Sequence, residues 1–335
     1  MSDNGQHDAG NEKGTWMTFR PEIKVLDCTI RDGGLMNDHR FDDSVVKAVY
    51  DSCVAAGVDY MELGYKNSVA QFPKDKFGPW KHCDEADMRR IVGDNPSDLK
   101  LSAMADAEKC DYKEDLLPAN ESVLDLIRVA TYIHQLPVAI DMLNHAHDLG
   151  YEVGINIMAV STVAESDLDE ALALLADTPA STIYLVDSFG SFYTEDVRKL
   201  TTKYVNVAKA AGKEVGIHAH NNQQLAYANT IEAIINGANY LDATCSGLGR
   251  GAGNCQLELL IGFLKNPRYR LRPILDCIET HIDPLQATMP WGFDLSYMIT
   301  GQMNQHPRAA IGHLDRPADE RQSIVEFYDS LMEQV

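Results

Sequence analysis

The sequence lacks the patterns that identify a secreted, membrane-spanning or disulfide-stabilised protein. Its seven cysteines are an odd number, and no two of them form a Cys-x-x-Cys pair. This argues against a disulfide framework and a structural zinc site. The N-terminal residues are polar and lack the apolar core of a signal peptide, and no run reaches the ~18 apolar residues of a transmembrane helix. We therefore expect a cytoplasmic protein that does not enter membranes.

Positive charge is also scarce. The chain carries 29 Lys and Arg against 50 Asp and Glu, which gives a formal net charge of −21. Because such a surface repels a phosphate backbone, we expect no nucleic-acid partner. With 335 residues, 45% of them hydrophobic, the chain is long enough for one barrel-sized domain and an appendage.

From Ile23 onward, short β-rich segments alternate with amphipathic segments such as 42–57 and 226–238, which have apolar residues at helical spacing. The β-rich segments recur roughly every 30 residues, as repeated βα units do. Eight such units predict an α/β fold, a (β/α)₈ TIM barrel rather than an open doubly wound sheet. We place the strands at residues 24–30, 59–65, 99–105, 124–130, 152–160, 182–188, 214–220 and 239–244.

Three regions follow from this pattern. Residues 1–20 are predicted to be a flexible tail, residues 21–265 the catalytic barrel, and residues 266–335 a helical extension over the barrel mouth. The C-terminal ends of all barrel strands face one site, so polar residues at these ends are candidates for function. They are Arg31, Asp32, Glu62, Asp106, Arg128, Asp187, His218 and His220, followed by Asn254 in the last loop.

His218 and His220 are two residues apart in a predicted strand and therefore point to the same face. Asp32 is expected to end the first strand, which lies near the seventh in a closed barrel. One carboxylate and two imidazoles leave open positions on a metal, and ligation without thiolate favours Mn²⁺, Mg²⁺, Co²⁺ or Fe²⁺, with Zn²⁺ also compatible. The alternative is an ordinary pair of surface or core histidines.

Two neighbouring features favour a carbanion or enolate chemistry at this metal. Arg31 precedes Asp32 and could hold a developing enolate oxygen. The glycine-rich loop 246–254 follows the last strand, where such barrels often bind anions, so Gly249 and Arg250 are candidates for substrate binding. The alternatives are a surface Arg–Asp pair and an ordinary glycine-rich turn.

Five segments, CTIRDGG, MELGY, LVDS, HAHNN and GLGRGAGN, together resemble the DRE-TIM metallolyase (HMGL-like) superfamily over residues 23–265. SGLGRGAGNCQLE and WGFDLSYMITGQMNQHP resemble its 4-hydroxy-2-oxovalerate aldolase-like branch. The resemblance implies that Arg31 stabilises an enolate and that a divalent metal, Mn²⁺ first, binds at the candidate ligands. These ligands are Asp32, His218, His220 and Asn254. Glu62 and Asp187 are expected to bind substrate in the site or to support the residues that line it, and Arg128 is expected to bind substrate.

The sequence departs from two branches of the superfamily. Gly251 stands where the lyase branch has a reactive cysteine, and Leu35 stands where the aldolases have a histidine base. The base is therefore sought among His39, Tyr297, which roughly matches a site tyrosine of the aldolases, His306 and a metal-bound water. A histidine of ordinary pKa would suit catalysis near neutral pH.

We predict a divalent-metal-dependent aldolase, a carbon–carbon lyase that cleaves or forms a 4-hydroxy-2-oxo acid through a pyruvate-type enolate. The alternatives are a Claisen-type synthase that joins an acyl-CoA to a 2-oxo acid, and a non-catalytic barrel that binds a metal and a carboxylate. The expected partners are a small 2-oxo acid, an aldehyde and a second copy of the chain. Four basic residues near the predicted mouth favour an anionic aldehyde: Lys74, Lys76, Lys81 and Arg308.

Overall fold

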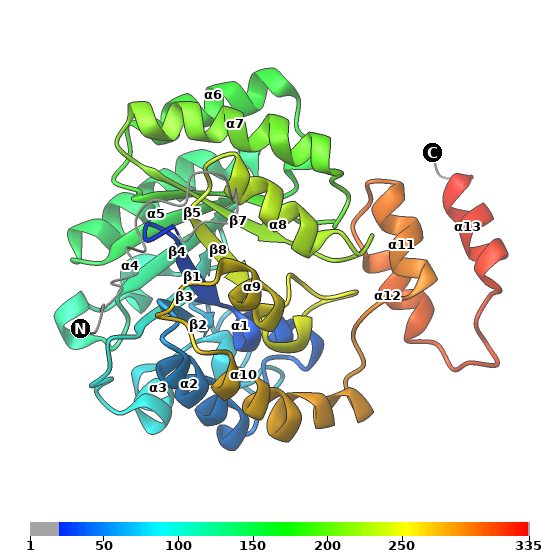
Figure 1. Cartoon of the computed structure of the whole chain (residues 1–335), viewed down its shortest axis with the longest axis horizontal. Helices are drawn as coiled ribbons and strands as arrows, with labels where there is room; N and C mark the ends of the chain where they lie inside the picture. The colour runs from blue at the N-terminus through cyan, green and yellow to red at the C-terminus, as the bar shows by residue number, and fades with distance from the viewer. Residues whose placement is uncertain (1–19, 334–335) are drawn as a thin grey trace, which may run out of the picture.

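The computed structural model describes residues 20–333, so nearly all of the predicted tail, residues 1–20, lies outside the described part. Within that part, eight parallel strands close into a barrel in chain order, with β8 paired to β1 and helices around the outside (Figure 1). The strands are β1 (Lys24–Asp27), β2 (Tyr60–Tyr65), β3 (Lys100–Asp106), β4 (Leu126–Thr131), β5 (Glu152–Ile157), β6 (Thr182–Asp187), β7 (Glu214–Ala219) and β8 (Tyr240–Ala243). The predicted TIM barrel is confirmed.

The helices that follow the strands form the outer layer, as in Figure 1. They are α2 (Asp43–Ala56), α3 (Glu85–Val92), α5 (Leu136–Asp148), α6 (Glu165–Ala176), α7 (Thr194–Ala210), α8 (Ala226–Ile235) and α9 (Leu257–Leu264), with α4 (Tyr112–Asp115) as a short addition. Helices α2 and α8 lie in the two segments with helical spacing. Apart from α4, each of these helices buries one apolar face against the strands.

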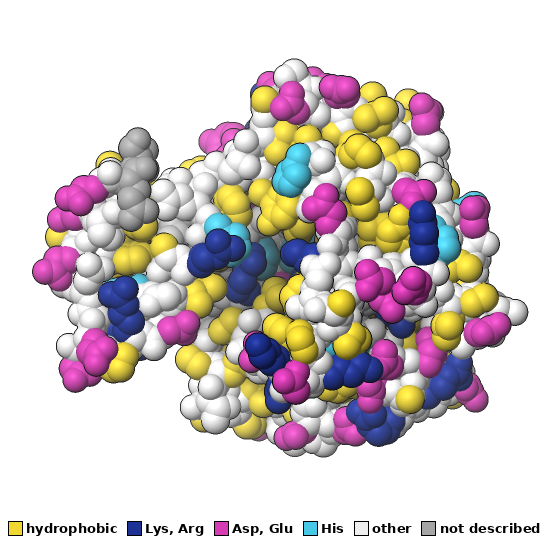
Figure 2. Space-filling model, turned by 180° about the vertical axis from the view of Figure 1, so that it is seen from behind, with side chains coloured by type: hydrophobic (Ala, Val, Ile, Leu, Met, Phe, Trp, Pro, Cys, Tyr) yellow, Lys and Arg dark blue, Asp and Glu magenta, His cyan; other side chains and the backbone are white. Residues whose placement is uncertain are grey.

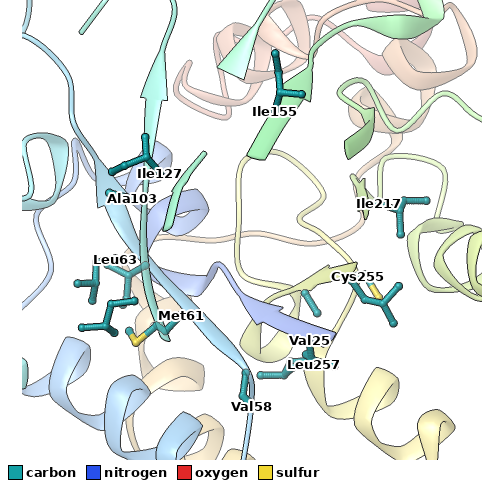
Figure 3. Packing of buried hydrophobic residues seen from close by; sticks show 14 of the residues in the cluster. Val25, Val58, Met61, Leu63, Ala103, Ile127, Ile155, Ile217, Cys255 and Leu257 are labelled. Atoms are coloured by element: carbon teal, nitrogen blue, oxygen red, sulfur yellow. The ribbon is translucent and has the colours of Figure 1, made fainter. Parts of the chain in front are cut away.

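The main hydrophobic core lies between the strands and these helices. Because strand side chains alternate, Met61 and Leu63 of β2 point outward together, as do equivalent residues of other strands (Figure 3). Each fully buried aliphatic side chain of this kind contributes roughly 1.5–3 kcal/mol. The inward positions are thereby left free for polar residues at the strand ends.

The start of the barrel differs from the sequence prediction. The first strand ends at Asp27 rather than residue 30, and Thr29–Gly33 forms a short helix, α1. The cause is local: the Asp27 carboxylate accepts hydrogen bonds from the Thr29 amide and hydroxyl, which turns the backbone out of the strand. Asp32 is therefore on a helix, not at a strand end. Gly34 has helical dihedrals that any residue can adopt. A glycine is required there because the His39 ring packs against its Cα: a Cβ would lie 2.2 Å from Nδ1 of His39.

The C-terminal residues of the described part are helical. Helix α10 (Leu271–Cys277) packs on α2, whereas α11 (Leu295–Gln302), α12 (Arg308–Leu314) and α13 (Ile324–Met332) form their own small apolar cluster. Figure 1 shows these last three helices at one side of the barrel. None of the helices within residues 20–333 is both long and apolar enough to cross a membrane.

Candidate active site

A small cavity, about 70 Å³, lies at the C-terminal ends of the strands. Six of the residues predicted from the sequence line it: Arg31, Asp32, Asp106, His218, His220 and Arg250. The structure thus brings together residues from α1, the ends of β3 and β7, and the glycine-rich loop. On the face seen in Figure 2, Lys, Arg and His side chains gather around a hollow, although acidic side chains are spread over much of the remaining surface.

Asp32, His218 and His220 are arranged as metal ligands. One ligand atom of each lies within 4.8 Å of the others, and all three residues are buried. Both carboxylate oxygens of Asp32 and Nε2 of His218 are buried without a hydrogen-bond partner among the described residues. Buried polar atoms are rarely left unpaired, so their convergence fits a cation.

Asn254 lies close to Asp32, since both side chains approach Gly249. Its Nδ2 donates to the Leu248 carbonyl (3.3 Å), which leaves Oδ1 buried and without a partner in the described chain. Gly249 lies directly against the ligands, since a Cβ there would be 2.2 Å from Nδ2 of Asn254 and 3.2 Å from Oδ2 of Asp32. Any larger residue at 249 would displace them. The residues present therefore fit a divalent metal with mixed oxygen and nitrogen ligands.

The ionisation states of Asp32 and His220 suit a metal, whereas the pKa of His218 is raised without one, because its hydrogen bonds to Asp242 and Asp32 outweigh the effect of burial. Burial works to raise the pKa of Asp32, but the charges of Arg31 and the two histidines hold it well below its usual value. Burial lowers the pKa of His220 well below its usual value. An ionised carboxylate and a neutral imidazole are the forms that bind metals.

Asp242, in β8, orients His218. Nδ1 of His218 lies 3.0 Å from Oδ2 of Asp242, and Nε2 lies 3.5 Å from Oδ2 of Asp32. A proton held at Nδ1 by the carboxylate leaves the lone pair of Nε2 facing Asp32, which is the tautomer required of a ligand. Asp242 was not predicted from the sequence. The signal that could have identified it is a carboxylate in the short and otherwise uncharged strand β8.

A buried charge network lies beneath the cavity. Arg31 Nε donates to Glu62 (2.7 Å), Arg128 donates to the same oxygen of Glu62 (3.1 Å), and Arg128 also donates to Asp242 (2.5 Å). Arg128 is fully buried, with its guanidinium 4.1 Å from the centre of the Tyr184 ring. Glu62 and Arg128, predicted to bind substrate, do not line the cavity. Instead, Glu62 binds Arg31, and Arg128 binds Glu62 and Asp242. The alternation of positive and negative charges offsets the cost of removing these groups from water.

Asp187 and His39 have partners elsewhere. The Asp187 carboxylate accepts from the amides of Ser191 and Phe192, and its pKa is raised to about 7 by burial. His39 packs edge-on against Tyr65, with 5.2 Å between ring centres, and burial lowers its pKa to about 2. Neither residue lines the cavity. A histidine of ordinary pKa is thus not found at position 39.

The extension reaches the barrel through a turn between α11 and α12. Asn304 Nδ2 donates to the Ser161 carbonyl, and its Oδ1 accepts from the Ser191 hydroxyl. Nη1 of Arg250 lies 3.3 Å from Nε2 of His306, whose pKa is lowered to about 4 by burial and by nearby arginines. Residues 304–306 therefore connect loops that follow three strands of the barrel.

The other candidates from the extension and the β2 loop lie off the cavity. Tyr297 is buried in the apolar cluster of α11–α13. Lys74 forms an ion pair with Asp84, and Lys81 is buried with its ammonium against the rings of Tyr65 and Phe72. Lys76 and Arg308 also do not line the cavity, so the four basic residues give no support to an anionic aldehyde.

Several residues that line the cavity were not predicted from the sequence. Tyr65, Met104, Ala130 and Met158 form a small apolar cluster that lines the cavity. Asn156 also lines it, with a buried Oδ1 that has no partner in the described chain. Tyr65 ends a strand, so the rule applied to polar residues at strand ends could have found it.

Comparisons with known proteins agree with this geometry. The sequence model of the HMGL-like family matches residues 22–286. The chain is 34% identical to an oxaloacetate decarboxylase of Mycobacterium tuberculosis over 74% of this chain and 71% of the relative. It is 30% identical to a 4-hydroxy-2-oxovalerate aldolase of Pelotomaculum thermopropionicum over 84% and 82% of the two chains.

Among solved structures, the N-terminal domain of a candidate aldolase from Bacteroides vulgatus has a TM-score of 0.76 and 27% identity. The match covers 93% of this chain and all of that domain. The resemblance inferred from the sequence motifs is confirmed, and the chain belongs to the HMGL-like family.

Proposed function

We propose that this protein is a divalent-metal-dependent carbon–carbon lyase, an aldolase that cleaves or forms a 4-hydroxy-2-oxo acid through a pyruvate-type enolate. One observation carries the proposal: the ligand atoms of Asp32, His218 and His220 lie within 4.8 Å of one another, and Nη1 of Arg31 lies 3.4 Å from Oδ1 of Asp32. Both Asp32 oxygens, Nε2 of His218 and Nη2 of Arg31 are buried without a hydrogen-bond partner among the described residues. The named relatives support it, since they cleave or decarboxylate 2-oxo acids according to their names.

Asp32, His218, His220 and Asn254 would hold the metal, which supplies a Lewis acid for the 2-oxo group and the carboxylate of the substrate. During cleavage the C3–C4 bond breaks and its electron pair moves toward C2 and its oxygen. Arg31 Nη2 donates to the oxygen on which this charge collects, while Glu62 fixes the guanidinium. The oxygen at C4 loses its proton as the aldehyde forms.

The size of the cavity supports a small 2-oxo acid and a small aldehyde. It is a small cavity of about 70 Å³. Its apolar wall of Met104, Ala130 and Met158 suits a short alkyl group.

Metal removal tests the proposal. Dialysis against a chelator should abolish pyruvate release from 4-hydroxy-2-oxo acids, and Mn²⁺, Mg²⁺, Co²⁺ or Zn²⁺ added singly should restore it to different extents. We expect Mn²⁺ to be most effective. Full activity in a sample shown to be metal-free by elemental analysis would contradict the mechanism. Thiol release from acetyl-CoA with 2-oxo acids would instead support the Claisen-type alternative.

A second candidate reaction is decarboxylation of oxaloacetate. It is favoured by Leu35, which lines the cavity at the position where the aldolases have their histidine base. Loss of CO₂ generates the same enolate but requires no removal of a hydroxyl proton. The two reactions share Arg31 and the metal ligands, so one protein can be assayed for both. A homodimer and a cytoplasmic location stay predictions from the sequence.

A further inference from the structure

The lining of the cavity contains one hydroxyl-bearing aromatic residue, Tyr65, which ends β2. It lines the cavity together with Arg31 and Asp32. Its hydroxyl makes no hydrogen bond to any residue within 20–333, although the residue as a whole is 94% buried (relative exposure 6%). A donor that is free inside a ligand cavity is available to a substrate oxygen.

The ring of Tyr65 is held firmly while its hydroxyl stays free. The ammonium of Lys81 lies 4.4 Å from the ring centre, in the range of a cation–π contact, and the His39 ring packs edge-on at 5.2 Å. Lys81 is itself enclosed, with Phe72 at 4.3 Å and Phe77 at 5.9 Å from its ammonium. A buried cation without a paired carboxylate is costly. The enclosed position of Lys81 therefore indicates that this residue serves to orient the Tyr65 ring.

Resting on the proposed function, we propose that Tyr65 is the catalytic acid–base group that exchanges a proton with the C4 oxygen, and that Lys81 positions its ring. In condensation, C3 of the enolate attacks the aldehyde carbon and the new C3–C4 bond forms. The carbonyl π pair moves to the aldehyde oxygen, which takes the proton of the Tyr65 hydroxyl. The phenolate is reprotonated by solvent, and cleavage runs the same steps in reverse.

The surroundings suit proton donation in the direction of condensation. Burial raises the pKa of Tyr65 above its usual value, although Arg31 opposes that shift, so the residue is a proton donor at neutral pH. The alternatives from the sequence are placed less well. Tyr297, His39 and His306 do not line the cavity, and Leu35, which does line it, has no group that transfers protons.

The test separates proton transfer at C4 from enolate formation. Tyr65→Phe should lower kcat for cleavage and formation of 4-hydroxy-2-oxo acids by about 10²–10⁴-fold. Oxaloacetate decarboxylation, which forms the enolate without proton transfer at C4, should change by no more than about threefold. Both are measured as pyruvate release at saturating metal. Tyr60→Phe is the matched control, because Tyr60 begins the same strand and its hydroxyl contacts Glu152 at the other end of the barrel.

Equal losses in both reactions would show that Tyr65 supports the enolate site or the fold and would overturn the inference. An unchanged aldolase rate would overturn it as well. A wild-type protein that decarboxylates oxaloacetate but forms no aldol product with any aldehyde also refutes Tyr65 as an acid–base group. Wild type inactive in both reactions with every metal refutes the proposed function itself.

Lys81 is tested by a double-mutant cycle. Lys81→Met should lower aldolase kcat by about tenfold and leave decarboxylation unchanged, whereas Lys74→Met, in an exposed ion pair of the same loop, should change neither. The double variant Tyr65→Phe/Lys81→Met should be no slower than Tyr65→Phe alone, because Lys81 acts only through that hydroxyl. Additive losses would overturn the positioning role of Lys81.

Discussion

The two sides of the cavity are built on different principles. On one side, Asp32 and His218 are held by a buried chain of charges that runs through Arg31, Glu62, Arg128 and Asp242. On the other side, the apolar cluster of Tyr65 and its neighbours holds its shape by packing. Charged networks require every member, whereas apolar walls tolerate changes of volume. The difference indicates that the first side holds the metal and the enolate, whereas the second contacts the partner substrate and carries the proposed acid–base group, Tyr65.

The largest expected effect is on the metal side. His220→Ala should lose metal occupancy and reduce both lyase reactions to background, because one of three neighbouring ligands is removed. The barrel should stay folded, since His220 lies at the end of β7 and not in a packed layer of the outer core. Elemental analysis, activity and circular dichroism measure the three outcomes. Normal metal content in this variant would contradict the assigned ligand.

Arg31→Lys is expected to have the next largest effect. Loss of a donor that stabilises charge developing in the transition state typically costs about 10²–10³ in kcat, with a smaller change in KM. Lysine keeps the charge but loses the planar fork that contacts Glu62. Steady-state kinetics on both substrates measure it. A variant with near-normal kcat would assign Arg31 a structural task only.

Asp242→Asn tests the layer behind the ligands. Without the carboxylate, His218 is less firmly held in its metal-binding tautomer, and metal affinity should weaken by about 10–100-fold. Asp187→Asn is the control, because Asp187 is equally buried but its carboxylate binds backbone amides. Titration calorimetry with Mn²⁺ compares the two. Equal affinities in both variants would separate Asp242 from the metal site.

On the apolar side, a smaller and more selective change is expected. Ala130→Val narrows the wall next to Met104 and Met158. It should shift preference by about tenfold toward the shorter of two alkyl aldehydes, since one methylene in such a pocket corresponds to about 1–3 kcal/mol. Competition between acetaldehyde and butanal measures the ratio. If the variant lost metal instead, the two sides of the cavity would not be independent.

The smallest effect concerns His306. Because its pKa in the folded protein is about 4, it is neutral at pH 6–9, and His306→Gln should leave the pH–rate profile there unchanged. Stability should respond at lower pH: a depressed histidine pKa makes the folded state bind fewer protons, so stability falls as pH drops from about 6.5 to 4. Thermal melting at pH 7 and pH 4.5 should show a smaller difference in the variant. A lost ionisation near neutral pH would assign His306 to catalysis.

The sequence was sufficient to predict the barrel, because its eight β-rich segments and the helical spacing between them are local patterns. It was also sufficient to predict that Asp32, His218 and His220 lie close together, although the predicted path of the backbone at Asp32 was wrong. The strand prediction could not see that the Asp27 side chain competes for the backbone of Thr29. Such side-chain interactions are not visible in hydrophobic periodicity.

The depth of each side chain was harder to predict. Glu62 and Arg128 were assigned to substrate binding as strand-end residues, but each is the third residue of a six-residue strand, and neither lines the cavity. The position at which a strand ends is poorly defined by hydrophobic periodicity. Tyr65, by contrast, was predictable, because it is the last residue of a predicted strand and has a polar hydroxyl. Only residues with charged, imidazole or amide side chains were taken as candidates at the strand ends.

Arg128 and the ring of Tyr184 contact each other below the cavity, and both are fully buried. This contact limits the path by which substrates reach the cavity. With the barrel axis filled, molecules reach Asp32 from the C-terminal side of the barrel, past residues such as Leu35, which is 36% exposed. A 2-oxo acid seated against Asp32 must enter before the aldehyde and leave after it. The enzyme is therefore expected to follow a compulsory order, with excess aldehyde trapping or blocking the bound donor.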